Sequence, residues 1–437
     1  MTCVRFLLPI AALLFATNLF AGPKFTYDEG KSSLELFSQV QFWSVGSYAP
    51  EDVPEPGKRL DFYIRRARFG FKGQVRPRLD YQFIFAFDNL GKDPYSGTIG
   101  SGQKLETTEF RVWDAYFMYH LDSTWANLSF GLQRPVVSRE CNNLWAQVNS
   151  QEFALTYYYM RDHLTTRPTA REVGVNIGGQ NTDSNRLWGV VYNAGVFDAA
   201  QEKTSDLAGS VKWSPLITGR LGVSIGQPES QYHKLSYNLN SFGKRKGVTI
   251  SGYTSWQGQT DEKCDPKDTF NLAKGTFTAK GYKGGFKQNT AIGADLLANY
   301  QGLTLDGEYS LLKREFTDAF QAAYNTIIKG TRYTDKVWHV RAGYSIPILE
   351  SHFIEPAVLY TEFDGDDNSV NYPAGRDKLI DAGVNWYVKK NNLKLSLHWL
   401  NQSGSPISMY AKKTADAKTG AYKVRDDAVV FAVQLLY

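Results

Sequence analysis

Hydrophobic and polar residues alternate with a period of two in many segments of this chain, each about ten residues long. In residues 79–87 every odd-numbered side chain is apolar or aromatic, whereas Asp80 and Gln82 lie at even positions. Residues 303–312 and 379–388 alternate in the same way. Because successive side chains of a strand point to opposite faces, the pattern predicts strands with one apolar and one polar face.

We predict sixteen strands of this kind. They lie near residues 34–47, 61–75, 79–89, 109–121, 125–135, 170–179, 187–196, 205–214, 219–227, 290–300, 303–314, 336–346, 352–363, 378–389, 392–402 and 427–437. Residues 246–256 also alternate, but counting them as a strand would make the total odd. We therefore expect this segment to lie within a large external loop.

The connections between these strands are alternately short and long. The long connections are residues 90–108, 136–169, 228–289, 315–335 and 403–426. Bacterial outer-membrane barrels have short periplasmic turns and longer external loops. The sequence therefore predicts an all-β protein, a transmembrane antiparallel β-barrel with both ends of the mature chain in the periplasm. A soluble β-protein, the alternative, would have shorter loops and fewer aromatic residues at its strand ends.

Both ends of the chain fit export to the outer membrane of a Gram-negative bacterium. The chain starts with one positive side chain, an apolar stretch and a small-residue cleavage point at Ala21-Gly22, which together are typical of a secretory signal peptide. The last strand ends on Tyr437, an aromatic residue suited to a membrane interface. We expect residues 1–21 to be the signal peptide and residues 22–437 to form the barrel domain.

Composition narrows the function. Aromatic residues make up 14% of the chain, as expected where such side chains gather at two membrane interfaces. The net charge of +5 is too small to indicate a nucleic-acid partner. The sequence has no Gly-x-Ser-x-Gly nucleophile motif, and its histidines show no grouping typical of a triad or metal site. We therefore expect neither enzymatic activity nor a cofactor.

A barrel of this size encloses an aqueous channel, so the predicted function is that of a porin for small polar solutes. Selectivity would depend on the charges that line the constriction. The candidate pore-lining residues are Arg65, Arg66, Arg68, Lys72, Arg134, Arg139, Lys212 and Arg341. In strand 61–75 we expect Arg66 and Arg68 to face the lumen and Arg65 to lie on the opposite face. The forked guanidinium of arginine suits phosphate or carboxylate.

Two alternatives remain open at this stage. Carboxylates such as Asp114, Glu308 and Asp381 are also expected to point inward, so the arginines could be structural ion pairs in a non-selective porin. A barrel-anchored surface adhesin, with residues 228–289 as its binding face, is the second alternative. The apolar segment 134–171 is too long for a free external loop, and we expect it to fold into the barrel as a constriction loop or to pack between subunits.

Several stretches resemble the phosphate-selective porin O and P family of Gram-negative outer membranes. They are IRRARFGFKG followed by LDYQFIFAFDN, FGLQRPVVSRE leading to NSQEFALTYYY, DAGVNWYVKKNNLKLSLHWL, and the final VVFAVQLLY. Arg65 and Arg66 match the paired arginines of that family's second strand. The resemblance implies a homotrimer of sixteen-stranded barrels in outer-membrane lipid, with inward-folded loops and an arginine-lined path for small anions.

The mature chain has two cysteines, Cys141 and Cys264, both in predicted loops. Exported proteins fold in an oxidising compartment, so the two could form a disulfide if both loops enter the lumen. The alternative is two unrelated thiols, one of them buried as a small hydrophobic residue.

Overall fold

The computed structural model describes residues 22–49, 57–92, 110–165, 169–181, 187–199, 213–259, 270–271, 276–277, 286–316, 318, 330–366, 376–404, 413–415, 422–424 and 427–437. The predicted signal peptide, Lys212 and Cys264 lie outside the described residues. No helix among the described residues is long and apolar enough to cross a membrane.

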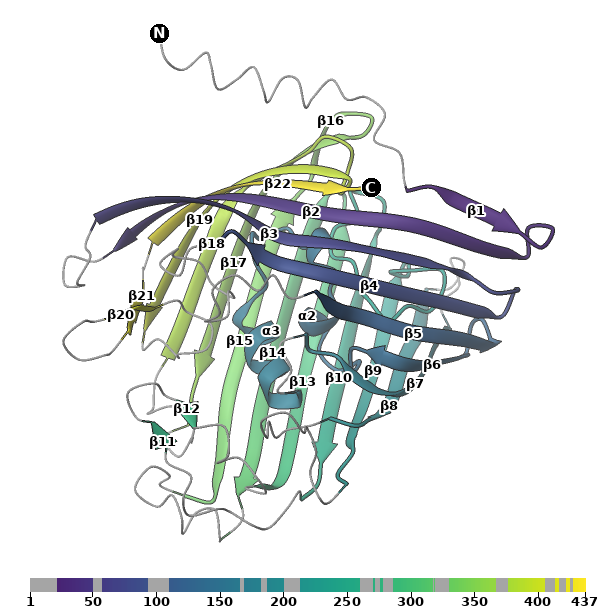
Figure 1. Ribbon diagram of the computed structural model, residues 1–437, viewed down its shortest axis with the longest axis horizontal. Helices are drawn as coiled ribbons and strands as arrows, with labels where there is room; N and C mark the ends of the chain where they lie inside the picture. The colour runs from purple at the N-terminus through teal and green to yellow at the C-terminus, as the bar shows by residue number, and fades with distance from the viewer. Residues whose placement is uncertain are drawn as a thin grey trace.

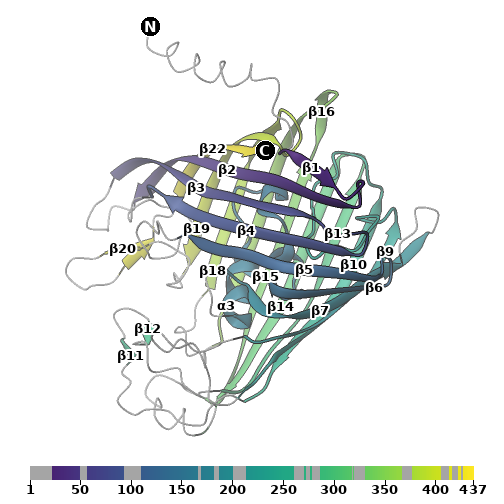
Figure 2. The same cartoon turned by 45° about the vertical axis from the view of Figure 1, so that its right-hand side comes forward.

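Sixteen long antiparallel strands form a closed barrel, which confirms the predicted fold (Figures 1 and 2). They are β2 (Ser32–Ala49), β3 (Gly57–Gln74), β4 (Leu79–Leu90), β5 (Arg111–Asp122), β6 (Ala126–Gln133), β7 (Glu172–Asn181), β8 (Trp188–Phe197), β9 (Leu216–Gly226), β10 (Gly247–Gln257), β13 (Phe286–Tyr300), β14 (Leu303–Phe316), β15 (Arg332–Tyr344), β17 (His352–Asp364), β18 (Arg376–Tyr387), β19 (Leu393–Gly404) and β22 (Asp427–Leu436). The barrel closes where β2 pairs with β22. Closure leaves no unpaired edge among these strands.

Short elements extend or connect the wall strands. Two of them, β1 (Lys24–Tyr27) and β16 (Ile346–Leu349), pair with β2 and β17 at the end of the barrel that carries the C-terminus. The others pair as two small antiparallel sheets, β11 (Phe270–Asn271) with β12 (Thr276–Phe277) and β20 (Lys413–Ala415) with β21 (Tyr422–Val424). Three helical segments, α2 (Arg139–Asn142), η2 (Trp145–Gln147) and α3 (Leu155–Leu164), lie between β6 and β7.

Two of the predicted strand assignments are wrong, and the errors cancel in the total. Residues 246–256 belong to the wall strand β10, which pairs along its whole length with β9 and β13. β8 pairs directly with β9, so no wall strand lies between them, contrary to the strand predicted at 205–214. Its described residues, 213 and 214, have no strand structure, and the rest lie outside the described residues. The alternation of residues 246–256 did indicate a strand. It was left out of the predicted wall only because, with the strand predicted at 205–214 included, counting it would have made the total odd.

Because β10 is a wall strand, residues 227–246 lie at the opposite end of the barrel from the one predicted. The amide of Gly226 donates to the carbonyl of Leu187, so the end of β9 lies beside the start of β8. That is the end with the short turns and the C-terminus, which faces the periplasm in bacterial barrels. The prediction of one external loop over residues 228–289 is therefore wrong for residues 228–246.

The alternation of side chains assigns the two faces of the wall as predicted. In β14 the buried positions hold Thr304, Asp306 and Ser310, whereas Leu303 and Tyr309 are exposed on the outside. Phenylalanine rings gather on the outer face of β3 to β6: Phe69, Phe71, Phe83, Phe85, Phe87, Phe110, Phe117 and Phe130 are linked by ring contacts of 4.9 to 6.4 Å. The polar residues therefore face the lumen, where the candidate site lies.

Candidate functional site: a constriction built from two inward segments

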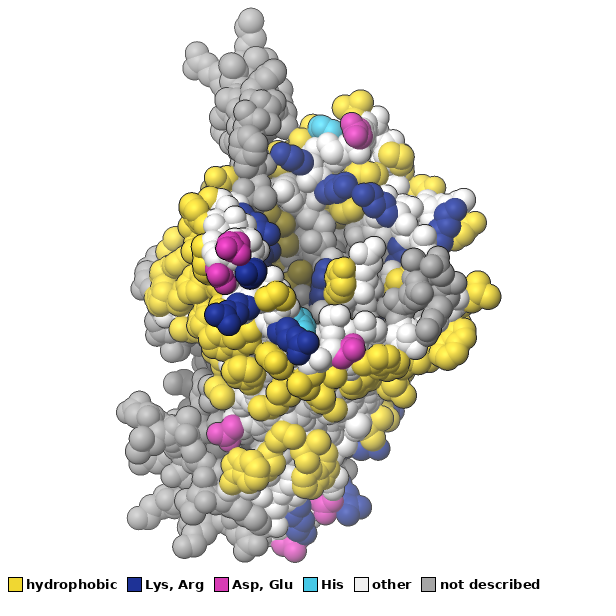
Figure 3. Space-filling model, turned by 90° about the vertical axis from the view of Figure 1, so that its right-hand side faces the viewer, with side chains coloured by type: hydrophobic (Ala, Val, Ile, Leu, Met, Phe, Trp, Pro, Cys, Tyr) yellow, Lys and Arg dark blue, Asp and Glu magenta, His cyan; other side chains and the backbone are white. Residues whose placement is uncertain are grey.

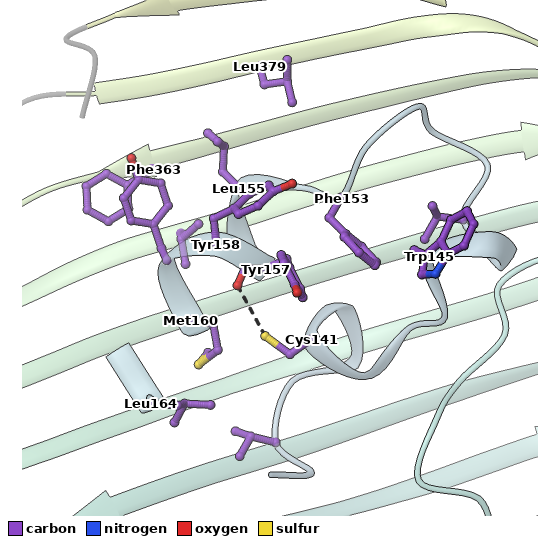
Figure 4. Packing of buried hydrophobic residues seen from close by; sticks show 14 of the residues in the cluster. Cys141, Trp145, Phe153, Leu155, Tyr157, Tyr158, Met160, Leu164, Phe363 and Leu379 are labelled. Atoms are coloured by element: carbon purple, nitrogen blue, oxygen red, sulfur yellow. Dashed lines mark hydrogen bonds between the residues drawn. The ribbon is translucent and has the colours of Figure 1, made fainter. Parts of the chain in front are cut away.

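The described part of residues 134–171, here called the constriction loop, lies inside the barrel, as predicted (Figure 1). Its helix α3 packs on the inner wall, where the ring of Tyr159 stacks on Phe363 at a centroid distance of 3.7 Å. Figure 4 shows aromatic and aliphatic side chains of α3 and the wall in one buried cluster. Apolar side chains that would be costly to expose to water therefore hold the loop in the lumen.

Glu152 anchors the constriction loop to β3. Its carboxylate accepts hydrogen bonds from Arg65 Nη2 at 2.7 Å and from Arg66 Nη2. Burial by itself raises the pKa of Glu152, but the two guanidinium groups outweigh it and lower the pKa to about 2. Glu152 is therefore a carboxylate at neutral pH, and it neutralises part of the positive charge of this arginine pair.

A β-bulge explains why both arginines point inward. Gln41 of β2 pairs with Arg66 and Phe42 pairs with Ile64, so Arg65 is an extra residue without a partner across the ladder. Such an insertion lets two successive side chains point to the same face. Arg65 and Arg66 are each 4% exposed, and the prediction that Arg65 lies on the outer face is wrong. A bulge is defined by how one strand pairs with its neighbour. The alternation of side chains within a single strand does not reveal that pairing, so the bulge could not be predicted from the sequence.

Further ion pairs anchor the loop to the far wall. Arg341 of β15 donates to the two carboxylate oxygens of Glu140 at 2.5 and 3.0 Å, and to Asp306 at 2.8 Å. Arg139 donates to Asp295 of β13 at 2.9 Å and to the carboxylate of Glu229 at 2.6 and 2.9 Å. Each of these guanidinium groups is therefore bound by carboxylates inside the protein.

A second segment, residues 228–246, enters the lumen from the end of the short turns. We call it the periplasmic segment. Tyr237 exchanges backbone hydrogen bonds with the constriction loop, donating to Asn142 at 3.0 Å and accepting from Leu144 at 3.1 Å. On the far wall the ring of Phe242 lies 5.0 Å from that of Tyr387. The two inward segments therefore form one unit, which the sequence did not predict because the segment was assigned to the external side.

A cavity of about 730 Å³ lies between the inner faces of β2 to β6 and the two inward segments. Figure 3 shows the end of the barrel that carries β1, where a rim of side chains, several of them Lys or Arg, surrounds a hollow. The charged side chains that line the cavity are Arg68, Lys72, Arg134, Arg171, Lys234, Glu35, Asp80 and Asp114. They comprise five cations and three carboxylates.

Three of these cations are paired with carboxylates. Arg68 donates to Asp88 at 2.9 Å and Arg171 to Asp114 at 2.8 Å, whereas Lys72 lies 3.1 Å from Glu35. Asp114 faces inward together with Trp113 because a second bulge, between β4 and β5, places both side chains in the lumen.

Arg134 and Lys234 differ from the other lining cations, because neither has a carboxylate within ion-pair distance in the described part of the chain. One nitrogen of Arg134, Nη1, donates to the carbonyls of Cys141 and Asn143 at 2.6 and 3.0 Å. Lys234 is exposed at the cavity edge. Carbonyl groups orient the guanidinium but do not cancel its charge.

A family model described as phosphate-selective porin O and P matches residues 42–425. The chain belongs to this family. A search of curated proteins finds no match. Among solved structures, OmpF of Salmonella typhi in complex with daunomycin is similar, with a TM-score of 0.53, 12% identity, and coverage of 95% of this chain and 100% of that chain. OmpT of Vibrio cholerae, with loop L8 deleted, gives a TM-score of 0.51 at 9% identity and covers 93% of this chain and 100% of that chain. The protein is thus a porin channel of the bacterial outer membrane.

The structure divides the predicted lining residues of this porin into two groups. Arg68, Lys72 and Arg134 line the cavity, whereas Arg65, Arg66, Arg139 and Arg341 are bound to the anchoring carboxylates of the constriction loop and its surroundings. Lys212 lies outside the described residues. Arg171 and Lys234, which also line the cavity, were not among the predicted lining residues. Arg171 lies at the start of the strand predicted at 170–179, where the chain leaves the loop, and that position was the only available signal.

The one group of possible metal ligands among the described residues is Glu140, Asp306 and His339, whose ligand atoms lie within 4.8 Å of one another. Arg341 donates hydrogen bonds to both of these carboxylates, and His339 Nε2 lies 3.0 Å from Asp306. The guanidinium of Arg341 therefore already supplies the positive charge that balances these two carboxylates. In this porin the group is an ion-pair network that anchors the loop.

Cys141 is a free thiol buried under α3, and its sulfur lies 3.7 Å from the carbonyl oxygen of Tyr157 (Figure 4). Burial raises the pKa of this thiol well above its usual range, which leaves it protonated and unreactive. Cys141 fits the alternative of a thiol buried as a small hydrophobic residue, and Cys264, the other cysteine of the possible disulfide, lies outside the described residues.

Proposed function

We propose that this porin passes small polar solutes by diffusion and favours anions over cations. The observation that carries the proposal is Arg134, a guanidinium that lines the cavity without a carboxylate partner in the described structure. Lys234 adds a second unpaired charge at the cavity edge. An uncompensated charge in a narrow, partly desolvated passage attracts counterions more strongly than it would in open water.

Reversal potentials across a KCl gradient test the proposal, because they report the preference for chloride over potassium directly. We expect wild-type porin to favour chloride, and Arg134→Gln and Lys234→Gln each to lower the permeability ratio. Removing one charge about 4 Å from a permeating ion in a water-like medium changes its energy by about 1 kcal/mol, which is about fivefold.

Lys244→Gln is the matched control, since Lys244 is an exposed cation of the same periplasmic segment that does not line the cavity. We expect this variant to keep the wild-type ratio. A wild-type channel that favours potassium, or equal effects of the three substitutions, would contradict the proposal. Retained resistance to unfolding in detergent at room temperature shows that each variant is folded.

A non-selective porin is the second candidate function. Four arginines of the candidate set, Arg65, Arg66, Arg139 and Arg341, are bound to buried carboxylates, so they add little free charge to the passage. A non-selective porin would show a permeability ratio of chloride to potassium close to one in the KCl gradient.

We also propose that the porin is a homotrimer whose contact surface includes the phenylalanine-rich outer face of β3 to β6. Contiguous aromatic side chains on one part of a surface are typical of protein interfaces. Mass measurement of the purified porin in detergent tests the trimer, and a monomeric mass would exclude it.

The family's phosphate-selective name and the predicted removal of residues 1–21 as a signal peptide are consistent with an exported anion porin.

A further inference from the structure

The cavity has two chemically different sides. The inner wall contributes the cations Arg68 and Lys72 from β3, and Arg134 follows the end of β6. On the other side, the constriction loop contributes Leu144, Trp145 and Ala146, and the periplasmic segment contributes Leu235. Leu144 is 37% exposed and therefore available to a solute. One side of the cavity thus carries cations together with carboxylates, and the other carries an apolar group that lies among the polar side chains Gln147, His233, Lys234, Ser236 and Asn238.

Aromatic rings also lie directly beside the charges. The guanidinium carbon of Arg68 is 4.1 Å from the ring centre of Trp113 and 5.6 Å from that of Trp145. Arg171 lies on the same Trp113 ring at 4.6 Å. These stacked contacts hold the positive groups and the rings in fixed positions. A solute that enters the cavity therefore meets a cation and an aromatic surface within a few ångströms of each other.

Inorganic phosphate fits this cavity poorly. Phosphate binding requires several donors to replace the water that surrounds the anion. Only Arg134 and Lys234 are unpaired among the described lining cations, and three carboxylates in the same lining repel a doubly charged anion more strongly than a singly charged one. An anion with an aromatic ring can instead place its charge toward Arg134 and its ring against the apolar side, where it loses contact with water favourably.

We propose that the cavity is a binding site for carboxylates that carry an aromatic ring, which it prefers over inorganic phosphate. The proposal rests on the anion preference proposed above and names the class of anion. One positive group would hold the carboxylate, and Leu144, Trp145 and Leu235 would cover the ring. Weak binding of this kind speeds passage because it raises the local solute concentration without trapping the solute.

Block of the chloride current by added anions tests this proposal in planar bilayers at constant ionic strength. The probes are benzoate, acetate and inorganic phosphate, applied separately to the wild-type porin. Acetate carries the same charged group as benzoate but lacks the ring. We expect half-block by benzoate at a concentration about tenfold lower than by acetate or phosphate, a ratio that corresponds to about 1.4 kcal/mol. Equal block by benzoate and acetate, or strongest block by phosphate, would overturn the proposal.

Two variants separate the roles of charge and ring. Leu144→Ser removes apolar surface from an exposed loop position, and we expect it to weaken block by benzoate toward the level of acetate. Arg134→Gln removes charge, and we expect it to weaken block by both carboxylates to a similar degree. A Leu144→Ser channel that still prefers benzoate about tenfold over acetate would contradict the assigned apolar side.

Failure of this inference can be distinguished from failure of the proposed function. A porin that favours chloride in the KCl gradient but shows no preference for benzoate retains the anion function and refutes the aromatic class. A porin without chloride preference refutes the proposed function, whatever the order of the blocking anions.

Discussion

At the scale of single residues, the role of each arginine depends on which carboxylate faces it. Arg66 is buried against Glu152, whereas Arg134 donates to backbone carbonyls and keeps its charge available to the cavity. From the sequence alone, both were predicted to line the pore. A buried pair is costly to break from one side, because the remaining charge stays desolvated without a partner.

We therefore expect Glu152→Gln to destabilise the porin strongly. The substitution leaves Arg65 and Arg66 buried without a carboxylate, and breaking a buried pair in this way costs about 3–5 kcal/mol. The midpoint of urea unfolding of the purified porin in lipid vesicles measures the effect. Glu29→Gln is the control, since Glu29 forms only an exposed pair with Lys31, and such pairs contribute about 0–1 kcal/mol.

An equal, small effect of both substitutions would mean that the contacts of Glu152 do not anchor the constriction loop. A second readout is the size of the single-channel current. We expect it to increase or fluctuate in Glu152→Gln, because the loop is then held by fewer contacts, and to stay unchanged in Glu29→Gln.

At the scale of elements, alternation assigns the two faces of each strand. The ring of Phe83 in β4 lies on the outside, 5.0 Å from Phe71 and 5.8 Å from Phe117, whereas its neighbour Gln82 lines the cavity. Bulges interrupt this rule at Arg65 and Trp113, where the strand pairing shifts by one residue. Both interruptions place an additional large side chain in the lumen beside the constriction loop.

The two neighbours on β4 provide a test of the faces. We expect Phe83→Lys to impair insertion, since a lysine on the outer face near the middle of the bilayer costs about 2–4 kcal/mol where it meets lipid, and an unpaired charge buried between subunits is costly as well. Gln82→Lys places the same charge one residue away on the lumen side, and we expect normal insertion with stronger anion preference. The fraction of heat-modifiable, folded porin in outer-membrane preparations measures the difference. Normal folding of Phe83→Lys would exclude the assigned outer face.

At the scale of the whole molecule, the lumen is divided. Two segments that enter from opposite ends of the barrel meet at Tyr237 and pack on one side, and the open cavity runs along β2 to β6 on the other. The ion pair between Arg139 and Glu229 joins the same two segments. The width of the passage therefore depends on contacts between the constriction loop and the periplasmic segment, which are far apart in the sequence.

Labelling of intact cells tests the corrected topology. In a Cys264→Ser background we expect Lys58→Cys, at the end of the barrel with the long loops, to react with a membrane-impermeant maleimide. Lys244→Cys, in the periplasmic segment, should react only after the outer membrane is opened. Both side chains are exposed, so accessibility to the reagent depends on the side of the membrane. Labelling of Lys244→Cys on intact cells would restore the external assignment of residues 228–246.

The sequence by itself determined the barrel, because lipid on one face and water on the other require a period of two, and that period is a local property of each segment. It also predicted that residues 134–171 are covered, in the lumen or between subunits, because many of their side chains are apolar; the structure selected the lumen. It did not determine the strand at 246–256 correctly, because this assignment depended on a count over the whole chain.

Only the tertiary structure decided which inward cations remain free. Arg341 and Glu140 are 201 residues apart in the chain and meet through a bidentate pair in the lumen. No local pattern connects such residues, because their distance is set by barrel closure and by the path of the constriction loop. The charge of the passage is what remains after these long-range pairs have formed, and for that reason Arg134 could be distinguished from Arg66 only in the folded protein.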